Sequence, residues 1–103
     1  MSLRKKQSQF VRMVGQLIAY ADSLGYELTF GDAYRSPKVK YGHARSLHRK
    51  RLAIDLNLFI DGKWMKKTKD FKALGAYWES IGGAWGGRFG DGNHFSLAHG
   101  GMR

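Results

Sequence analysis

The chain has no cysteine and a single proline among its 103 residues. The absence of cysteine excludes disulfide bonds and thiolate ligands, so a bound metal would have only nitrogen and oxygen donors. Acidic residues are scarce, because eight Asp and Glu stand against 18 Lys and Arg, and the formal charge is +10. No long apolar run occurs either. Arg12, Gln16 and Asp22 interrupt the region where a signal peptide or a membrane span would begin.

The composition predicts one globular domain over residues 1–103, and the hydrophobic spacing predicts an α+β fold with two main helices packed on a small antiparallel sheet. Hydrophobic residues make up 43% of the chain, and no linker or internal repeat divides it. Gly25 is expected to end the first helix, Thr68 to cap the second, and Asp61-Gly62 to form a hairpin turn. The hydrophobic spacing predicts helices over 5–24 and 68–81, and strands over 26–34, 52–60, 63–65 and 94–97.

Asp55 is out of place in the strand predicted over 52–60. It falls on the face opposite Leu52, Ile54, Leu56 and Leu58. A carboxylate on a half-buried strand is costly unless a cation or a hydrogen-bond donor meets it. His48, seven residues earlier, can share a site with Asp55 only if the chain turns or bulges between them. We therefore expect His48 in a loop and a cation between the two side chains.

A second group of polar residues lies near the C-terminus. Gly90, Gly92 and Asn93 indicate a turn, and the strand that follows places His94 on the face away from Phe95. Two imidazoles and one carboxylate form a recurrent three-ligand set for catalytic zinc, which leaves a fourth position for water. The sequence thus predicts Zn²⁺ on His48, Asp55 and His94. Asp91 would be the general base that takes the proton of the water.

Two motifs resemble a known family of enzymes. The segment from Ser46 to Asp55 is similar to the Ser-x-His-x-x-Gly-x-Ala-x-Asp signature of the zinc peptidoglycan peptidases, and Asp91-x-x-His94 resembles their second motif. This family includes D-Ala-D-Ala carboxypeptidases and dipeptidases and phage L-alanyl-D-glutamate endopeptidases. An Asp at position 91, where many members have Glu, resembles the phage branch. Arg51 departs from the pattern, because the family usually has Gly there.

The resemblance implies a hedgehog/D-Ala-D-Ala peptidase-like fold and roles for further residues. An Arg at the position of Arg35 would hold a substrate carboxylate or stabilise the oxyanion, and the alternative is a surface arginine before a Ser-Pro turn. Ser46 would hydrogen-bond a ligand or the substrate, or be an ordinary loop serine. His43 matches no ligand position, and we expect it in the loop or at the rim, with a possible substrate contact. His99 is expected to be solvated in a glycine-rich tail.

The charge of +10 admits two partner classes. Lysines and arginines around residues 45–51 and 63–69, with Trp64 for stacking, would suit a nucleic acid, but no nucleic-acid motif accompanies them. Anionic polymers of the bacterial envelope fit the same charge. A structural zinc module would require a fourth ligand instead of a base.

From these residues and the resemblance we expect a monomeric endolysin that cleaves the L-alanyl-D-glutamate bond of the peptidoglycan stem peptide and so lyses the cell. A D-Ala-D-Ala carboxypeptidase or dipeptidase is the alternative, and a basic nucleic-acid-binding module is a more distant one. The enzyme would be made in the host cytoplasm without a signal peptide and would act on the cell wall after release.

Overall fold

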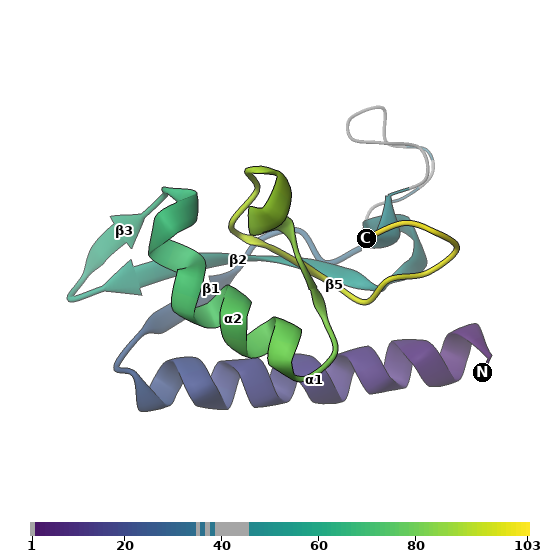
Figure 1. The fold of residues 1–103 in the computed structure, drawn as a ribbon, viewed down its shortest axis with the longest axis horizontal. Helices are drawn as coiled ribbons and strands as arrows, with labels where there is room; N and C mark the ends of the chain where they lie inside the picture. The colour runs from purple at the N-terminus through teal and green to yellow at the C-terminus, as the bar shows by residue number, and fades with distance from the viewer. Residues whose placement is uncertain (1, 35, 37, 39–45) are drawn as a thin grey trace.

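A computed structural model describes residues 2–34, 36, 38 and 46–103. It shows the expected α+β fold, a small antiparallel sheet with two α-helices (Figure 1). The strands are ordered β1-β2-β5-β4, and β3 also pairs with β2. With η for a 3-10 turn, the elements are α1 (Leu3–Ser23), β1 (Glu27–Phe30), η1 (Leu47–Lys50), β2 (Ala53–Ile60), β3 (Lys63–Met65), η2 (Thr68–Phe71), α2 (Lys72–Ser80), β4 (Ala84–Trp85), η3 (Gly86–Phe89) and β5 (His94–Ser96).

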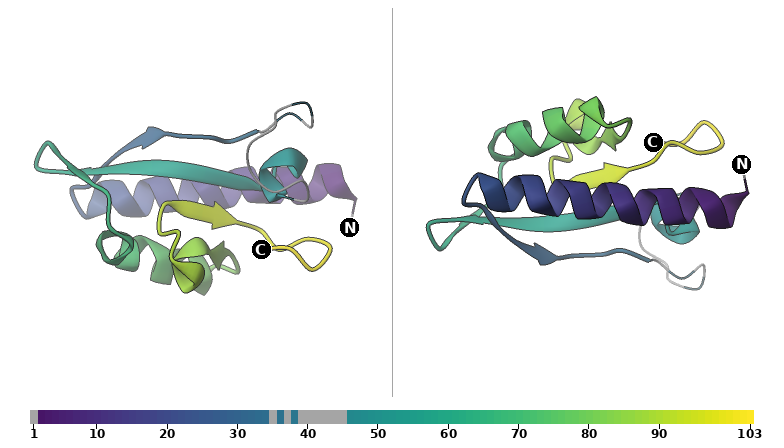
Figure 2. Two further views of the ribbon diagram at one scale, coloured as in Figure 1. Left: turned by 90° about the horizontal axis from the view of Figure 1, so that it is seen from above. Right: turned by 90° about the horizontal axis from the view of Figure 1, so that it is seen from below.

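The two helices cover different parts of the sheet. Helix α1 runs along one face beneath β2, whereas α2 lies beside β5 on the flank away from β1 (Figures 1 and 2). Phe10 of α1 packs edge-on against Trp78 of α2, with ring centroids 5.7 Å apart. Gly25, at φ +76°, follows the end of α1 as predicted. In the described part of the chain, no helix is both long enough and apolar enough to cross a membrane.

Strand β2 is the centre of the sheet and alternates as the sequence predicts. Leu56 and Leu58 are fully buried towards the core, while Asp55 and Asn57 lie on the other face and are half-buried. The hairpin to β3 turns through Asp61 and Gly62, both with positive φ, as a two-residue turn of type I′ requires. The core continues into Trp78, whose indole N–H donates to the carbonyl oxygens of Ala84 and Ser96.

Strand β1 is shorter than the predicted 26–34 because its ladder is interrupted opposite Asp55. Gly31 N–H donates to Asp55 O, and Asp55 N–H donates to Asp32 O, both at 2.8 Å. Two residues therefore face one, which is the pattern of a β-bulge. A Cβ on Gly31 would lie only 3.2 Å from Asp55 Cβ. The bulge thus lies directly beside the anomalous carboxylate.

The predicted cap at Thr68 is wrong. Asp70 Oδ2 accepts from Lys67 N–H at the start of η2, and α2 itself begins at Lys72. The hydroxyl of Thr68 instead accepts from Gly92 N–H at 3.2 Å. A residue that looked like a local cap therefore fixes the loop before β5.

The C-terminal tail also differs from the expected solvated segment. His99 and Met102 exchange backbone hydrogen bonds of 3.0 and 2.9 Å, and Met102 packs against the core. The ring of His99 is half-buried, and its Nδ1 lies 3.4 Å from Lys6 Nζ on α1. The contact with α1 could not be read from the local glycine-rich sequence.

Candidate metal centre

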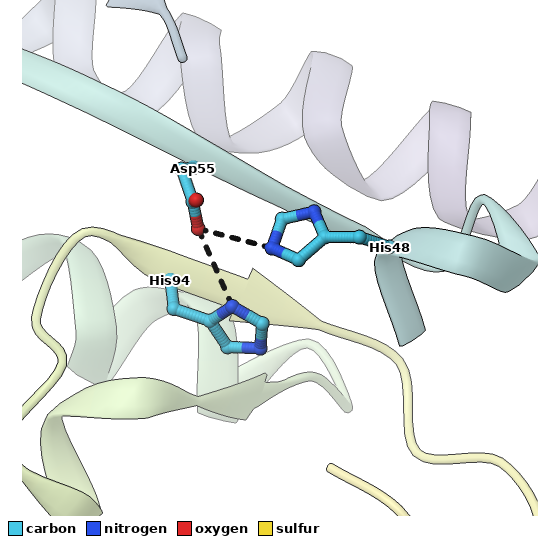
Figure 3. A group of neighbouring side chains, drawn as sticks. All are labelled: His48, Asp55 and His94. Atoms are coloured by element: carbon cyan, nitrogen blue, oxygen red, sulfur yellow. Dashed lines mark ion pairs between the residues drawn. The ribbon is translucent and has the colours of Figure 1, made fainter. Parts of the chain in front are cut away.

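The structure brings His48, Asp55 and His94 together (Figure 3). Asp55 and His94 are directly paired across β2 and β5, so their side chains leave the sheet on one face. His48 reaches them from η1. The sequence required the chain to turn between His48 and Asp55, and η1 supplies that turn.

Arg51 explains how the chain turns after His48. It is in the left-handed region, with φ 57° and ψ 36°, at the end of η1. Glycine adopts this conformation without a steric cost, which gives a physical reason for the glycine usual at this position in the family. The guanidinium of Arg51 lies over the ring of Tyr34, 4.1 Å from its centroid. This cation–π contact offsets part of the backbone cost.

The donor atoms of the three residues converge on one point. Asp55 Oδ1 lies 3.3 Å from His48 Nε2 and 3.3 Å from His94 Nδ1, and one donor atom from each residue lies within 4.8 Å of the others. Both histidines are buried, at 3% and 8% exposure. Asp55 Oδ1 is buried too, and within the described chain it has no hydrogen-bond partner of good geometry. A buried carboxylate oxygen left in this state is costly.

These residues fit a zinc ion. Two nitrogens and one carboxylate oxygen are the donor set of many catalytic zinc sites, and a metal would satisfy the orphaned Oδ1. The second nitrogen of His48, Nδ1, faces Ala33 O at 3.4 Å, so a carbonyl is available to fix the orientation of the ring. We infer that His48, Asp55 and His94 would hold the ion.

Asp55 has the charge that a metal ligand needs. Burial alone would raise its pKa, but the two facing imidazoles outweigh burial and lower the pKa from 3.8 to about 2. The carboxylate is therefore anionic at neutral and mildly acidic pH, even in the metal-free protein.

Asp91 lies in the loop before β5 and is exposed. Its carbonyl accepts from His94 N–H at 3.1 Å, and its own N–H donates to Gly86 O at 2.9 Å. Its carboxylate is not among the three converging ligands, so a fourth-ligand role has no support in this geometry. The role of Asp91 as a general base stays a prediction.

The loop that carries Asp91 is held by contacts that the sequence did not reveal. The indole N–H of Trp85 donates to Gly92 O at 2.8 Å. Gly86 packs so closely that an added Cβ would lie 2.3 Å from Asp91 O and 2.7 Å from His94 Cβ. The contacts of Trp85 and Gly86 depend on β4 and η3, which the sequence did not predict.

The remaining expected site residues have different outcomes. Arg35 and His43 lie outside the described residues. Ser46 caps η1, because its hydroxyl accepts from His48 N–H at 3.3 Å. It therefore positions the turn that carries a ligand, and its predicted contact with substrate stays a prediction.

A model of the D-alanyl-D-alanine carboxypeptidase family matches residues 40–97, which is more than half of the chain and contains all three converging ligands. The chain belongs to this family. Its members are zinc-dependent peptidases, so the match agrees with the donor set found in the structure. No curated protein gives a match to the chain.

Proposed function

We propose that this member of the D-alanyl-D-alanine carboxypeptidase family is a peptidoglycan endopeptidase that cleaves the L-alanyl-D-glutamate bond of the stem peptide. The observation that carries the peptidase chemistry is the convergence of His48, Asp55 and His94, with Asp55 Oδ1 buried and without a hydrogen bond of good geometry. The choice of bond rests on Asp91, since an aspartate three residues before the last histidine resembles the phage branch. Lysis of the bacterial cell would be the biological result.

In this proposal the metal ligands, Asp91 and Arg35 have separate roles in the reaction. His48, Asp55 and His94 would hold a zinc ion, and the bound ion would supply Lewis acidity for activating water and polarising the scissile carbonyl. Asp91 accepts the proton of the attacking water and transfers it to the leaving nitrogen. Arg35 would hold a substrate carboxylate or stabilise the oxyanion. The burial of both histidines keeps bulk water from competing for the ligands.

The partners follow from the same proposal. The substrate is the stem peptide, and the charge of +10 favours contact with the anionic polymers around it. A monomer made in the host cytoplasm and released to the cell wall would be sufficient for this activity. A nucleic-acid role would leave the His48-Asp55-His94 convergence without a use.

The decisive experiment is digestion of purified peptidoglycan by the zinc-loaded protein, with mass spectrometry of the fragments. New N-terminal D-glutamate that disappears with a chelator is the expected result. Release of terminal D-alanine alone would instead support carboxypeptidase activity, the second candidate, which the description of the matching family favours. Absence of any cleavage by the zinc-loaded protein would refute both.

Asp91→Ala tests the proposed base. We expect it to retain zinc while its rate of cleavage falls about 10²- to 10⁴-fold, because only proton transfer is lost. Asp22→Ala, which removes an exposed carboxylate from α1, is the matched control and should be unaffected. Near-normal cleavage by Asp91→Ala would remove Asp91 from the mechanism.

A further inference from the structure

A small hollow lies beside Asp91, on the same face of the sheet as the metal centre. We name it the Asp91 hollow. Its volume is about 280 Å³, just below the range of small-ligand sites, which span about 300–1,000 Å³. It therefore suits a group the size of a side chain better than a polymer. The residues with polar or aromatic side chains that line it include Asn57, Trp64, Lys66, Thr68, Asp91 and Asn93.

Two elements carry both lining residues of the hollow and ligands of the candidate metal centre. Asn57 follows Asp55 by two residues on β2, so both side chains leave the same face of the strand. Asn93 directly precedes His94, and its carbonyl accepts from Leu56 N–H at 2.9 Å. The hollow therefore lies next to the metal centre, within reach of a neighbouring residue of a peptide bound there.

Hydrogen bonds and close packing fix the wall of the hollow in the absence of a ligand. Gly92 is fixed by Thr68 and by Trp85, through hydrogen bonds of 3.2 and 2.8 Å. A Cβ on Gly92 would lie 2.6 Å from Thr68 Cα, so the loop and η2 are in close contact. Such a fixed wall reduces the entropy lost when a ligand is ordered.

Lys66 gives the hollow a positive charge. Among the described residues that line it, Lys66 is the one cation and Asp91 the one anion. The ammonium group of Lys66 lies 4.2 Å from the ring centroid of Trp64, which holds the long side chain over β3. Lys63, Lys67, Lys69 and Asp70 line a neighbouring hollow that shares Trp64 and Lys66, so lysines outnumber the carboxylate and the local field is positive. An anionic ligand is favoured despite the presence of Asp91.

The proposed substrate has a carboxylate close to the scissile bond. If Asp91 returns the proton to the leaving nitrogen, the residue that carries this nitrogen lies next to Asp91. In the L-alanyl-D-glutamate reaction that residue is D-glutamate, which continues through its γ-carboxyl group and keeps its α-carboxylate free, one carbon from the leaving nitrogen. We propose that Lys66 binds this α-carboxylate and makes the enzyme selective for D-glutamate over its α-amide. This inference rests on the proposed function.

A binding measurement tests the inference without requiring catalysis. The probes are γ-D-glutamyl-L-lysine, which represents the leaving product, and the same dipeptide with the α-carboxyl group of its D-glutamate amidated. Each is titrated into the zinc-loaded protein. Tryptophan fluorescence reports binding, because Trp64 is 52% exposed whereas Trp78 and Trp85 are buried. We expect the free carboxylate to bind about 10- to 100-fold more tightly than the amide, as hydrogen bonds to charged groups imply.

Three variants show whether Lys66 causes the preference. Lys66→Met keeps the apolar stem over Trp64 and should lose most of the preference, whereas Lys66→Arg should retain it. Lys72→Met is the matched control, since Lys72 is exposed on α2 and lines neither hollow. Equal affinity of the wild-type protein for both probes, or an undiminished preference in Lys66→Met, would overturn the inference.

Cleavage of L-alanyl-γ-D-glutamyl-L-lysine in parallel separates this inference from the proposed function. Cleavage by a protein that binds both probes equally would overturn the role of Lys66 and leave the endopeptidase function in place. Selective binding through Lys66 without cleavage would support the carboxylate site and refute the endopeptidase function.

Discussion

Asp55→Asn should remove most of the stabilisation of the fold by zinc. Asp55 provides the one anionic ligand of the three and, in the metal-free protein, has a buried oxygen with no good hydrogen-bond partner. Asparagine has nearly the same shape but carries no charge. The substitution therefore removes the electrostatic attraction for the metal and leaves the packing around β2 almost unchanged.

The size of the effect follows from linkage. A ligand present at 100 times its Kd stabilises the native state by about 2.7 kcal/mol, which corresponds to a rise in Tm of about 10–20 °C for a domain of this size. If the substitution weakens zinc binding 100-fold or more, the same zinc concentration contributes at most about 0.4 kcal/mol. The remaining rise in Tm should then be about 3 °C or less.

Calorimetric melting with zinc and with a chelator measures both quantities. Asp22→Asn is the matched control, because it neutralises an exposed carboxylate on α1 away from the site, and it should show the full zinc-dependent rise. A full rise in Asp55→Asn would refute the reasoning, since the carboxylate would then be dispensable for binding. So would a wild-type Tm that zinc leaves unchanged.

Two further substitutions test the backbone around the site. Gly86→Ala should lower the free energy of unfolding by about 1–3 kcal/mol, measured by urea denaturation, because its Cβ would overlap Asp91 O; Gly15→Ala, with open space on α1, should raise it by about 0.5–1 kcal/mol. Equal effects of the two would contradict the close packing. Arg51→Ala should cost about 0.5–1 kcal/mol by losing the contact with Tyr34, whereas Arg51→Gly should be nearly neutral because it also relieves the left-handed backbone. A larger loss of unfolding free energy in Arg51→Gly than in Arg51→Ala would show that the left-handed backbone at Arg51 has a negligible cost.

The sequence was informative wherever a local period or turn carried the signal. The alternation around Asp55 predicted which face of β2 is buried, and the pair Asp61-Gly62 predicted the hairpin to β3. The apolar spacing over 68–81 also predicted the second helix, and α2 lies within that range. In each case neighbouring residues determine the outcome, so a single sequence contains the information.

The sequence failed where distant segments meet. The pairing of Asp55 with His94 depends on the register of strands almost 40 residues apart, and a slip of one residue would turn one side chain to the other face. The resemblance of the motifs, not their periodicity, linked the two. The bulge at Gly31 and the contact of Thr68 with Gly92 had no local signal, because each depends on a hydrogen bond to a residue distant in the sequence.

The metal centre depends on the position of β2 more strongly than the Asp91 hollow does. Asp55 and Asn57 alternate with Leu56 and Leu58, which are fully buried, so any shift of β2 would disturb the metal centre and the core together. Lys66 and Trp64 lie on or just after the three-residue strand β3, where both side chains are exposed. Substitutions there can alter the charge and shape of the Asp91 hollow without moving a metal ligand. Substitutions in or just after β3 should therefore alter the preference for the residue that carries the leaving nitrogen. Substitutions in β2, η1 or β5 should instead cause loss of zinc.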